Sequence, residues 1–358
     1  PSLPIIQFPG VSFSGVSMVR IAHFDVNIAR QPIGEGGFGK VFRAKNLSED
    51  PPMECAAKQM RSVPGLKAAV EKEVKVMQEI GNHSSIIGLL HIEYVGEHAT
   101  PAASNSVWLF MELATGGELF DRLITSGNLT ERAVAPYFKG MVDALLHCHL
   151  KGVVHRDIKL ENVMLCAEDP HAIKIIDFGL AVCLASDKTL LHEKVGSKSY
   201  RAPEILASID GYRGPPVDVW ALGITVFSLV SGFFPLDEAK PSDWRFAKLA
   251  QDHANGIGPC DSIYAMYKRQ CPFSAELKEL LNSMLAIDPA RRANMRQVSE
   301  HRWFASKAEE AQAAFTEDGD EVLYRGAGGE DDTAPPFEMP EMAMPISRQR
   351  ACMGDTLA

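Results

Sequence analysis

Residues 155–162 read His155-Arg156-Asp157-Ile158-Lys159-Leu160-Glu161-Asn162. Within these eight residues lie a carboxylate that can accept a proton, a lysine that can neutralise phosphate charge and an asparagine that can bind a metal. Asp177-Phe178-Gly179 comes fifteen residues after Asn162 and offers a second, acidic metal ligand. The combination indicates phosphate chemistry, which also needs a phosphate-binding loop and further cations.

The composition is that of an ordinary globular protein whose charge is unevenly distributed. Of the 358 residues, 46% are hydrophobic and 23% are charged, and the length allows two domains or one two-lobed domain. The formal net charge is −10, but eleven carboxylates and only one cation, Arg325, lie between Glu309 and Glu341. The remainder is close to neutral, so nucleic-acid binding is not expected. Residues 305–358 are predicted to be an acidic, disordered tail in preference to a recognition arm.

The cysteines give an expectation for the cellular compartment. There are seven, scattered along the chain without a C-x-x-C pair. This argues against a disulfide framework and for a reducing compartment. No basic segment precedes an apolar core in the first residues, so no secretory signal is expected. We therefore expect a cytoplasmic protein, with access to the nucleus left open.

One apolar run, Val219–Phe234, raises the question of a membrane span. It has 16 residues, contains two glycines and two serines, and lies between Asp218 and Asp237. A helix that is apolar on all sides is more often buried in a large core than embedded in lipid. We predict a core helix and no membrane span.

A glycine-rich run lies near the start of the chain: Ile33-Gly34-Glu35-Gly36-Gly37-Phe38-Gly39-Lys40-Val41. It fits the pattern G-x-G-x-x-G-x-V, in which glycines let the backbone approach phosphates and present N–H groups to them. Dinucleotide-binding folds use a similar spacing, but they continue into a helix with an acidic residue about twenty positions later. Here a strand, Val41–Ala44, leaves the run, so the loop is expected between two strands.

A lysine follows on the next predicted strand. Glu54–Met60 is a short β-like run that carries Lys58, and Leu66–Ile80 has a helical pattern. A lone lysine on a strand is usually solvated. A phosphate-binding lysine needs an acidic partner to fix it, and the helix offers both Glu71 and Glu73.

The chain resembles the eukaryotic protein kinases in the order of five motifs. They are the glycine-rich run, the strand that carries Lys58, residues 155–162, Asp177-Phe178-Gly179 and Ala202-Pro203-Glu204. The likeness covers roughly Phe24–Phe304 and departs from the commonest pattern at Ile158 and at Ala57. It implies an α+β, bilobal protein-kinase fold with a small β-rich lobe and a larger, mainly helical lobe. The implied division is an N-terminal extension (1–23), a kinase domain (24–304, with lobes 24–112 and 116–304) and the tail (305–358).

The resemblance implies ATP as a cofactor and assigns its phosphates to the small lobe. The glycine loop, Ile33–Val41, would cover the phosphates, and Lys58 would hold the α- and β-phosphates. The family pattern Glu-Val-x-x-Met favours Glu73 over Glu71 as the residue that fixes this lysine.

The apolar strand Val107–Leu113 resembles the kinase hinge. Backbone groups there would meet the adenine edge, and a gatekeeper side chain, Met111, would lie behind the base while also belonging to the core. The residues that the resemblance assigns to the base are Ala56, Met111, Glu112, Leu113, Ala114 and Met164.

The resemblance also assigns the catalytic roles. Phosphoryl transfer needs little covalent help, so positioning and charge neutralisation supply most of the rate. Asp157 would accept or orient the proton of the substrate hydroxyl, and Lys159 would contact the γ-phosphate. Asn162 and Asp177 would be oxygen ligands for Mg²⁺, with Mn²⁺ as an alternative. Each of these residues alone would be interpreted as a surface residue. The order of the motifs along the chain favours the kinase interpretation.

Three charged residues are expected to be structural. In the family, an aspartate at the position of Asp218 hydrogen-bonds the backbone of the catalytic loop. Glu204 with Arg292 resembles a buried ion pair of the large lobe.

The catalytic loop predicts the acceptor. Tyrosine kinases typically carry Ala-Ala-Arg in the part of the loop where this chain has Ile158-Lys159-Leu160-Glu161, and Ser197 matches the serine or threonine of serine/threonine kinases. Protein substrates with serine or threonine are therefore expected. Glu118 and Glu161 lie where many kinases bind an arginine three residues before the acceptor. The alternative is that both are solvated surface glutamates.

A basic pocket is expected after the acceptor. Arg201, with Lys194 and Lys198, would favour either a proline or an acidic residue at that substrate position, and the sequence does not choose between them.

Glu193 replaces a residue that many family members phosphorylate. It lies four residues before Ser197, where its carboxylate could pair with Arg156 without phosphorylation. We predict basal activity on this ground, with both residues in regulatory roles. An acidic residue followed by Val195-Gly196-Ser197 resembles the calcium-dependent and calcium/calmodulin-dependent kinases.

The competing interpretation is a pseudokinase scaffold that binds nucleotide without transferring phosphate. Loss of Lys58, Asp157 or Asp177 would have indicated it, and all three are present. No complete EF-hand loop is found, so calcium binding by this chain is not expected. The stretch Lys307–Phe315 is a candidate inhibitory or docking helix for a regulatory partner.

Overall fold

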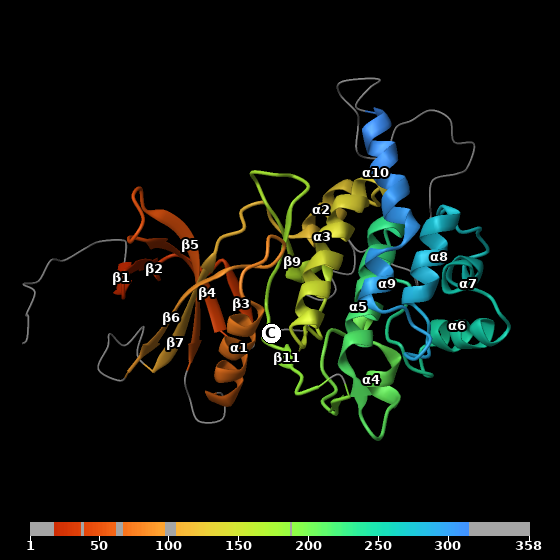
Figure 1. Cartoon of the computed structure of the whole chain (residues 1–358), viewed down its shortest axis with the longest axis horizontal. Coiled ribbons are helices and arrows are strands. Elements are labelled where there is room, and N and C mark those ends of the chain that lie inside the picture. Colours follow the sequence, from red (N-terminus) through yellow and green to blue (C-terminus); the bar gives the residue numbers. More distant parts are fainter. Residues whose placement is uncertain (1–17, 37–38, 62–66, 97–104, 187, 315–358) are drawn as a thin grey trace, which may run out of the picture. The chain divides into compact units, whose positions relative to one another are not determined.

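The computed structural model describes residues 18–36, 39–61, 67–96, 105–186 and 188–314. The chain divides into two compact units: residues 1–74 with 88–113, and residues 75–87 with 114–358. Figure 1 shows an antiparallel sheet and helix α1 first in the chain, followed by a helical region. The predicted α+β kinase fold is thereby confirmed.

The first unit is an antiparallel sheet. Its strands follow the order β1-β2-β4-β5-β7-β6, and β3 pairs with the other part of β4. Strand β1 differs from the expected extension 1–23, because it pairs with β2 and so joins the sheet. The bounds are β1 (Met18–Ile21), β2 (Phe24–Asn27), β3 (Gly34–Gly36), β4 (Gly39–Asn46), β5 (Met53–Arg61), β6 (Leu89–Val95) and β7 (Ser106–Glu112).

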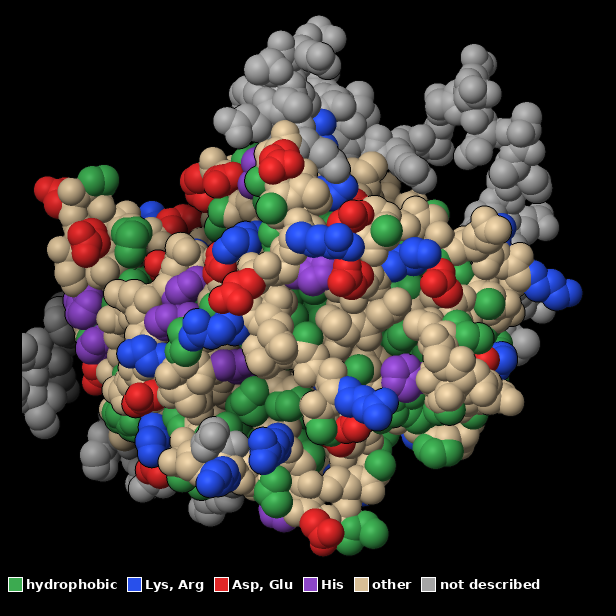
Figure 2. Space-filling model, turned by 45° about the vertical axis from the view of Figure 1, so that its right-hand side comes forward, with side chains coloured by type: hydrophobic (Ala, Val, Ile, Leu, Met, Phe, Trp, Pro, Cys, Tyr) green, Lys and Arg blue, Asp and Glu red, His purple; other side chains and the backbone are tan. Residues whose placement is uncertain are grey.

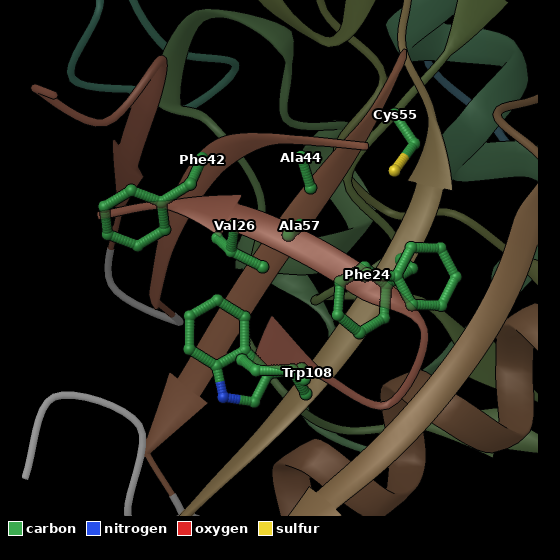
Figure 3. Packing of buried hydrophobic residues seen from close by; sticks show 9 residues of the cluster. Phe24, Val26, Phe42, Ala44, Cys55, Ala57 and Trp108 are labelled. Atoms are coloured by element: carbon green, nitrogen blue, oxygen red, sulfur yellow. The ribbon is translucent and has the colours of Figure 1, made fainter. Parts of the chain in front are cut away.

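A cluster of buried side chains fills one face of this sheet (Figure 3). The rings of Phe24 and Phe110 stack with centroids 3.8 Å apart, and Trp108 is fully buried beside them. Successive residues of a strand point to opposite faces. Because Ala57 belongs to the cluster, its neighbour Lys58 on β5 is directed to the other face. The core thus determines where the functional lysine points.

Helix α1 (Lys67–Ile80) matches the predicted helical pattern. The division between the two compact units falls within it, after Val74.

The second unit is mainly helical, and its short strands form two-residue and three-residue pairings. Its helices are α2 (Leu119–Ser126), α3 (Glu131–Leu150), α4 (Pro203–Ala207), α5 (Gly214–Ser231), α6 (Trp244–Ala254), α7 (Pro259–Met266), α8 (Ala275–Met284), α9 (Met295–Ser299) and α10 (Arg302–Ala314), with 3₁₀ turns η1 (Leu160–Asn162) and η2 (Lys198–Tyr200). The strands pair antiparallel as β8 (Val153–Val154) with β11 (Val182–Cys183), β9 (Val163–Leu165) with β10 (Ile173–Ile175), and β12 (Leu190–Leu191) with β13 (Tyr212–Arg213).

Helix α5 is almost entirely buried in this unit. It alone among the described helices is long and apolar enough to span a membrane, but 83% of it is buried inside the protein. Its apolar surface is therefore covered by neighbouring helices, as the core-helix prediction requires. At its end, Gly232 adopts a φ of +79°, which is typical of a glycine that terminates a helix.

The predicted buried ion pair of the large lobe is present. The Arg292 guanidinium donates to both carboxylate oxygens of Glu204, at 2.6 and 3.0 Å, and its side chain is fully buried. It also donates to the Ala286 and Pro216 carbonyls and lies 5.1 Å from the ring centroid of Trp220. With these partners the buried charge is fully compensated.

The predicted disordered tail, residues 305–358, begins within a helix. Helix α10 extends to Ala314, beyond the expected domain end at residue 304, and residues 315–358 lie outside the described part of the chain.

Candidate active site

The predicted lysine and glutamate meet in the first unit. Lys58 Nζ donates to Glu73 Oε1 at 2.6 Å, and only 8% of Lys58 and 3% of Glu73 are exposed. Of the two candidate glutamates, Glu73 points from α1 to β5, whereas Glu71 is exposed. Buried charges of this kind persist only when paired, so the lysine ammonium has a fixed position on the sheet.

The glycine-rich run lies between β3 and β4, as predicted, with Gly36 opposite Gly39. At Gly39 a φ of +149° and a potential Cβ position 2.1 Å from the Gln59 carbonyl oxygen exclude any side chain. Gly37 and Phe38 are outside the described residues. The salt bridge from Lys40 to Glu35 is exposed and contributes little to stability.

The predicted hinge is the end of β7. Met111 is 9% exposed and stands opposite Ala56 of β5, so these two assigned residues are neighbours. The Glu112 amide donates to the Gly88 carbonyl, and its carboxylate accepts the Gly88 amide at 3.2 Å. The side chain of Glu112 therefore fixes the strand end, a role that the sequence did not reveal because 24 residues separate the partners.

In the second unit, Asp218 holds the catalytic loop by its backbone. Its two carboxylate oxygens accept the amides of His155, at 2.9 Å, and Arg156, at 2.8 Å, and His149 Nε2 lies 2.9 Å away. Burial opposes the charge on Asp218, but the His149 hydrogen bond and the neighbouring charge outweigh it and lower its pKa. The predicted structural role of Asp218 is confirmed.

Asp157 is the centre of a hydrogen-bonded cluster. Its Oδ1 accepts both the amide and the hydroxyl of Ser197, each at 2.8 Å. Its Oδ2 accepts from Asn162 Nδ2 at 3.2 Å and lies 3.0 Å from Lys159 Nζ. Lys159 Nζ also donates to the Ser197 hydroxyl at 3.0 Å. One hydroxyl is thus held between a carboxylate and an ammonium group.

The expected metal ligands lie on neighbouring segments. Asp177 follows β10, adopts a φ of +58° and accepts the Gly179 amide, while the Ile176 amide donates to the Asn162 carbonyl. Asn162 uses its amide nitrogen toward Asp157, which leaves its side-chain oxygen as the atom suited to a hard cation. No group of three or more His, Cys, Asp or Glu suited to a metal occurs among the described residues. An amide oxygen and a carboxylate are hard oxygen donors, so Asn162 and Asp177 suit Mg²⁺ that also binds phosphate oxygens.

Arg156 connects the catalytic loop (residues 155–162) with the activation segment (residues 177–204). Its Nη1 lies 2.7 Å from Glu193 Oε2, and its Nε donates to the Leu180 carbonyl at 2.8 Å. The arginine side chain is 1% exposed, whereas that of Glu193 is 62% exposed. Tyr212 of β13 donates to the Glu193 carbonyl at 2.7 Å and adds a contact that the motifs did not indicate.

Two of the assigned peptide-binding residues lie on adjacent segments. Glu118, at the start of α2, forms an isolated bridge with Met164, which follows Glu161 by three residues. Glu161 accepts a hydrogen bond from the Tyr200 hydroxyl at 3.2 Å. Glu161 is therefore hydrogen-bonded to the activation segment, through the hydroxyl of Tyr200.

The cations expected to form a basic pocket after the acceptor are bonded within the protein. Arg201 donates to the Gly196 carbonyl and to Glu238, while Lys198 pairs with Asp237 at 2.7 Å. Lys194 donates to the Leu206 carbonyl. The carboxylates that pair with Arg201 and Lys198 lie 37 and 39 residues further along the chain, so the motifs did not indicate them, and the basic pocket after the acceptor stays a prediction.

Comparison with known proteins gives one family. The model of the protein kinase domain family matches residues 28–304. A CBL-interacting protein kinase 26 from Oryza sativa subsp. japonica is 32% identical over 311 residues, which cover 86% of this chain and 57% of that protein. A CBL-interacting serine/threonine-protein kinase 24 from Arabidopsis thaliana is 31% identical over 292 residues, which cover 80% and 58%. The chain thus spans less than two thirds of the length of the curated relatives it matches.

Proposed function

Because this chain belongs to the protein kinase family, we propose that it transfers the γ-phosphate of ATP to serine and threonine hydroxyls of proteins. The observation that carries the proposal is the Ser197 hydroxyl between Asp157 and Lys159. The Asp157 carboxylate accepts the O–H of this serine, and the Lys159 ammonium donates to the same hydroxyl oxygen. A substrate hydroxyl attacking a phosphate needs the same two neighbours.

The assigned residues have separate roles in the reaction. Lys58, held by Glu73, neutralises the α- and β-phosphates, and the glycine loop between β3 and β4 provides amide donors for them. Asn162 and Asp177 hold Mg²⁺, which when bound shields the negative charge of the phosphate oxygens. Asp157 orients the acceptor hydroxyl and takes its proton, while Lys159 meets the transferred group.

The function is tested by transfer from γ-labelled ATP to peptides that differ only in the acceptor residue. We expect labelling of the serine and threonine peptides in the presence of Mg²⁺ and none of the tyrosine peptide. Binding of ATP without transfer to any peptide or protein would instead support the pseudokinase scaffold.

The pairing of Lys58 with Glu73 gives a matched prediction. Glu73→Gln removes the charge that holds Lys58 and should lower kcat/KM about 100-fold, the scale of a catalytic group displaced by about 1 Å. Glu71→Gln, on the exposed face of the same helix, should leave kcat/KM unchanged. Equal effects of the two variants in a steady-state peptide assay would contradict the assignment.

We further propose that the substrate carries an arginine three residues before its acceptor, bound by Glu118 and Glu161. Glu161→Gln should reduce the preference for arginine over alanine at that position about fivefold, as expected for an exposed charge pair. The ratio of kcat/KM for the two peptides is the measurement. Glu168→Gln, at an exposed carboxylate elsewhere, serves as the control. An unchanged ratio in Glu161→Gln would show that Glu161 does not bind the substrate arginine.

Activity without phosphorylation of the activation segment is proposed from the ion pair between Arg156 and Glu193. Glu193→Gln should lower the activity of the unphosphorylated protein about fivefold, because a half-exposed pair contributes about 1 kcal/mol. The same pair should weaken as salt is raised, since salt screens exposed charges. Both proteins are assayed on a peptide after mass spectrometry has excluded phosphate. Equal inactivity of the wild type and Glu193→Gln would contradict the proposal.

A regulatory protein partner and a cytoplasmic location complete the proposal. The relatives are named as CBL-interacting kinases. In this chain, the candidate docking stretch Lys307–Phe315 and the rest of the tail are the sites proposed for a partner. We place the kinase domain at residues 24–304 and this chain near the calcium-dependent and calcium/calmodulin-dependent kinases. Co-purification from a cytosolic extract, with and without calcium, tests the partner and the location together.

A further inference from the structure

A groove of about 850 Å³ lies in the helical unit, away from the residues assigned to phosphate transfer. Its walls are the C-terminal end of α3, the β12–β13 pair, the start of α5 and the start of α9. The lining is largely apolar and includes Leu146, Leu150, Leu190, Val219 and Met295. This volume lies at the upper end of the range for pockets that take a small ligand, and it also suits a short peptide.

The apolar side chains of the groove reach the surface. Leu150 is 68% exposed and Leu190 is 45% exposed, although both are large hydrophobic residues. The loop between α4 and β13 lines the groove with Ser208 and Gly211, and on the same loop Ile209 is 95% exposed. In the lower part of the face drawn in Figure 2, hydrophobic side chains gather between Lys and Arg side chains. Neighbouring exposed hydrophobic residues of this kind mark an interaction site.

Two arginines give the groove its charge. Arg213 of β13 and Arg296 of α9 both line it and are exposed. Among the described residues, neither makes a salt bridge, whereas Arg292, which also lines the groove, is paired with Glu204. A ligand that fits the groove therefore combines apolar side chains with at least two carboxylates.

The chain itself contains such a segment. Residues 337–346 read Phe337-Glu338-Met339-Pro340-Glu341-Met342-Ala343-Met344-Pro345-Ile346, with two carboxylates, no cation and eight apolar residues. Methionine adapts well to irregular apolar surfaces. The composition of the whole tail favours a solvated segment, but these ten residues depart from it.

The reach of the chain allows this segment to arrive at the groove. Helix α10 begins three residues after α9, whose start lines the groove, and its 13 residues are roughly 20 Å long. Between Ala314, the last described residue, and Phe337 lie 22 residues, which can span about 70 Å when extended. Attachment to the same chain raises the effective concentration of the segment to the millimolar range. We propose that residues 337–346 dock intramolecularly in this groove, with Glu338 and Glu341 facing Arg213 and Arg296.

The docking is tested in the full-length chain by hydrogen exchange, so its outcome does not depend on kinase activity. We expect the amides of the α3 C-terminal end and of α9 to be protected in the wild type. Exchange there should rise about three- to tenfold in Arg213→Glu/Arg296→Glu, the effect of losing two exposed charge pairs. Glu338→Lys/Glu341→Lys should give the same rise, and the four changes together should restore protection. Glu330→Lys/Asp332→Lys is the control with equal charge elsewhere in the tail.

A second measurement uses a probe peptide. Fluorescein-labelled peptide 335–347 should bind the full-length Glu338→Lys/Glu341→Lys chain at least threefold more tightly than the wild type, whose groove is occupied. Leu150→Asp, at an exposed position, should reduce this binding without lowering Tm. Protection that is unchanged by the tail variants, or that grows with protein concentration and so reports contact between two copies, would overturn the proposal.

Discussion

Asp157→Asn is expected to lower kcat for phosphate transfer by about 100- to 10,000-fold, the usual contribution of a general base. An asparagine oxygen can still accept the amide of Ser197, so the loop should keep its conformation. It cannot take a proton, and it no longer offers Lys159 a charge at 3.0 Å. The loss should therefore appear in kcat, while the affinity for ATP stays within about twofold of the wild type.

Single-turnover kinetics and nucleotide binding separate these two quantities. Asp210→Asn, which makes the same chemical change on the surface loop beyond α4, should keep full activity. Circular dichroism melting shows whether the variant is folded. An Asp157→Asn protein that is folded and retains a tenth or more of the wild-type kcat would remove Asp157 from the role of base.

Arg292→Leu should lower the free energy of unfolding by about 3–5 kcal/mol, because it leaves the Glu204 carboxylate buried without its partner. Glu204 loses two donors, at 2.6 and 3.0 Å, and the Pro216 and Ala286 carbonyls each lose one. For a unit of this size the change corresponds to a fall in Tm of roughly 10 °C.

The matched control is an exposed ion pair. Lys139 and Asp143 on α3 lie 2.5 Å apart with 50% and 39% of their side chains exposed, so Lys139→Met should cost less than about 0.5 kcal/mol. Thermal and urea unfolding of both variants give the comparison. If Arg292→Leu were no more destabilising than Lys139→Met, burial would not determine the contribution of these pairs.

Local patterns predicted most of the fold and the centre of the site. The glycine loop, the strand of Lys58 and helix α3 each follow from residues within a few positions of one another. The choice of Glu73 over Glu71 rested on the family pattern Glu-Val-x-x-Met, and the ion pair with Lys58 agrees with it. Strand β1 was not predicted, because four residues without alternation carry no strand pattern and its formation depends on pairing with β2.

Contacts between distant residues were the part that the sequence left open. Arg201 pairs with Glu238, which lies 37 residues further along the chain, and no motif indicated this partner. Nothing in the spacing of two polar loops indicates which of their charges will meet. The groove could not be predicted for the same reason, because four separate segments of the chain build its walls.

The contact between Arg156 and Glu193 has a consequence for how a signal could be ended. A phosphate on an activation segment is removed by a phosphatase, but an encoded carboxylate is not a substrate for one. An enzyme activated by such a pair has no dephosphorylated resting state to return to. Its output would then follow its rates of synthesis and degradation, together with whichever partners or segments cover it.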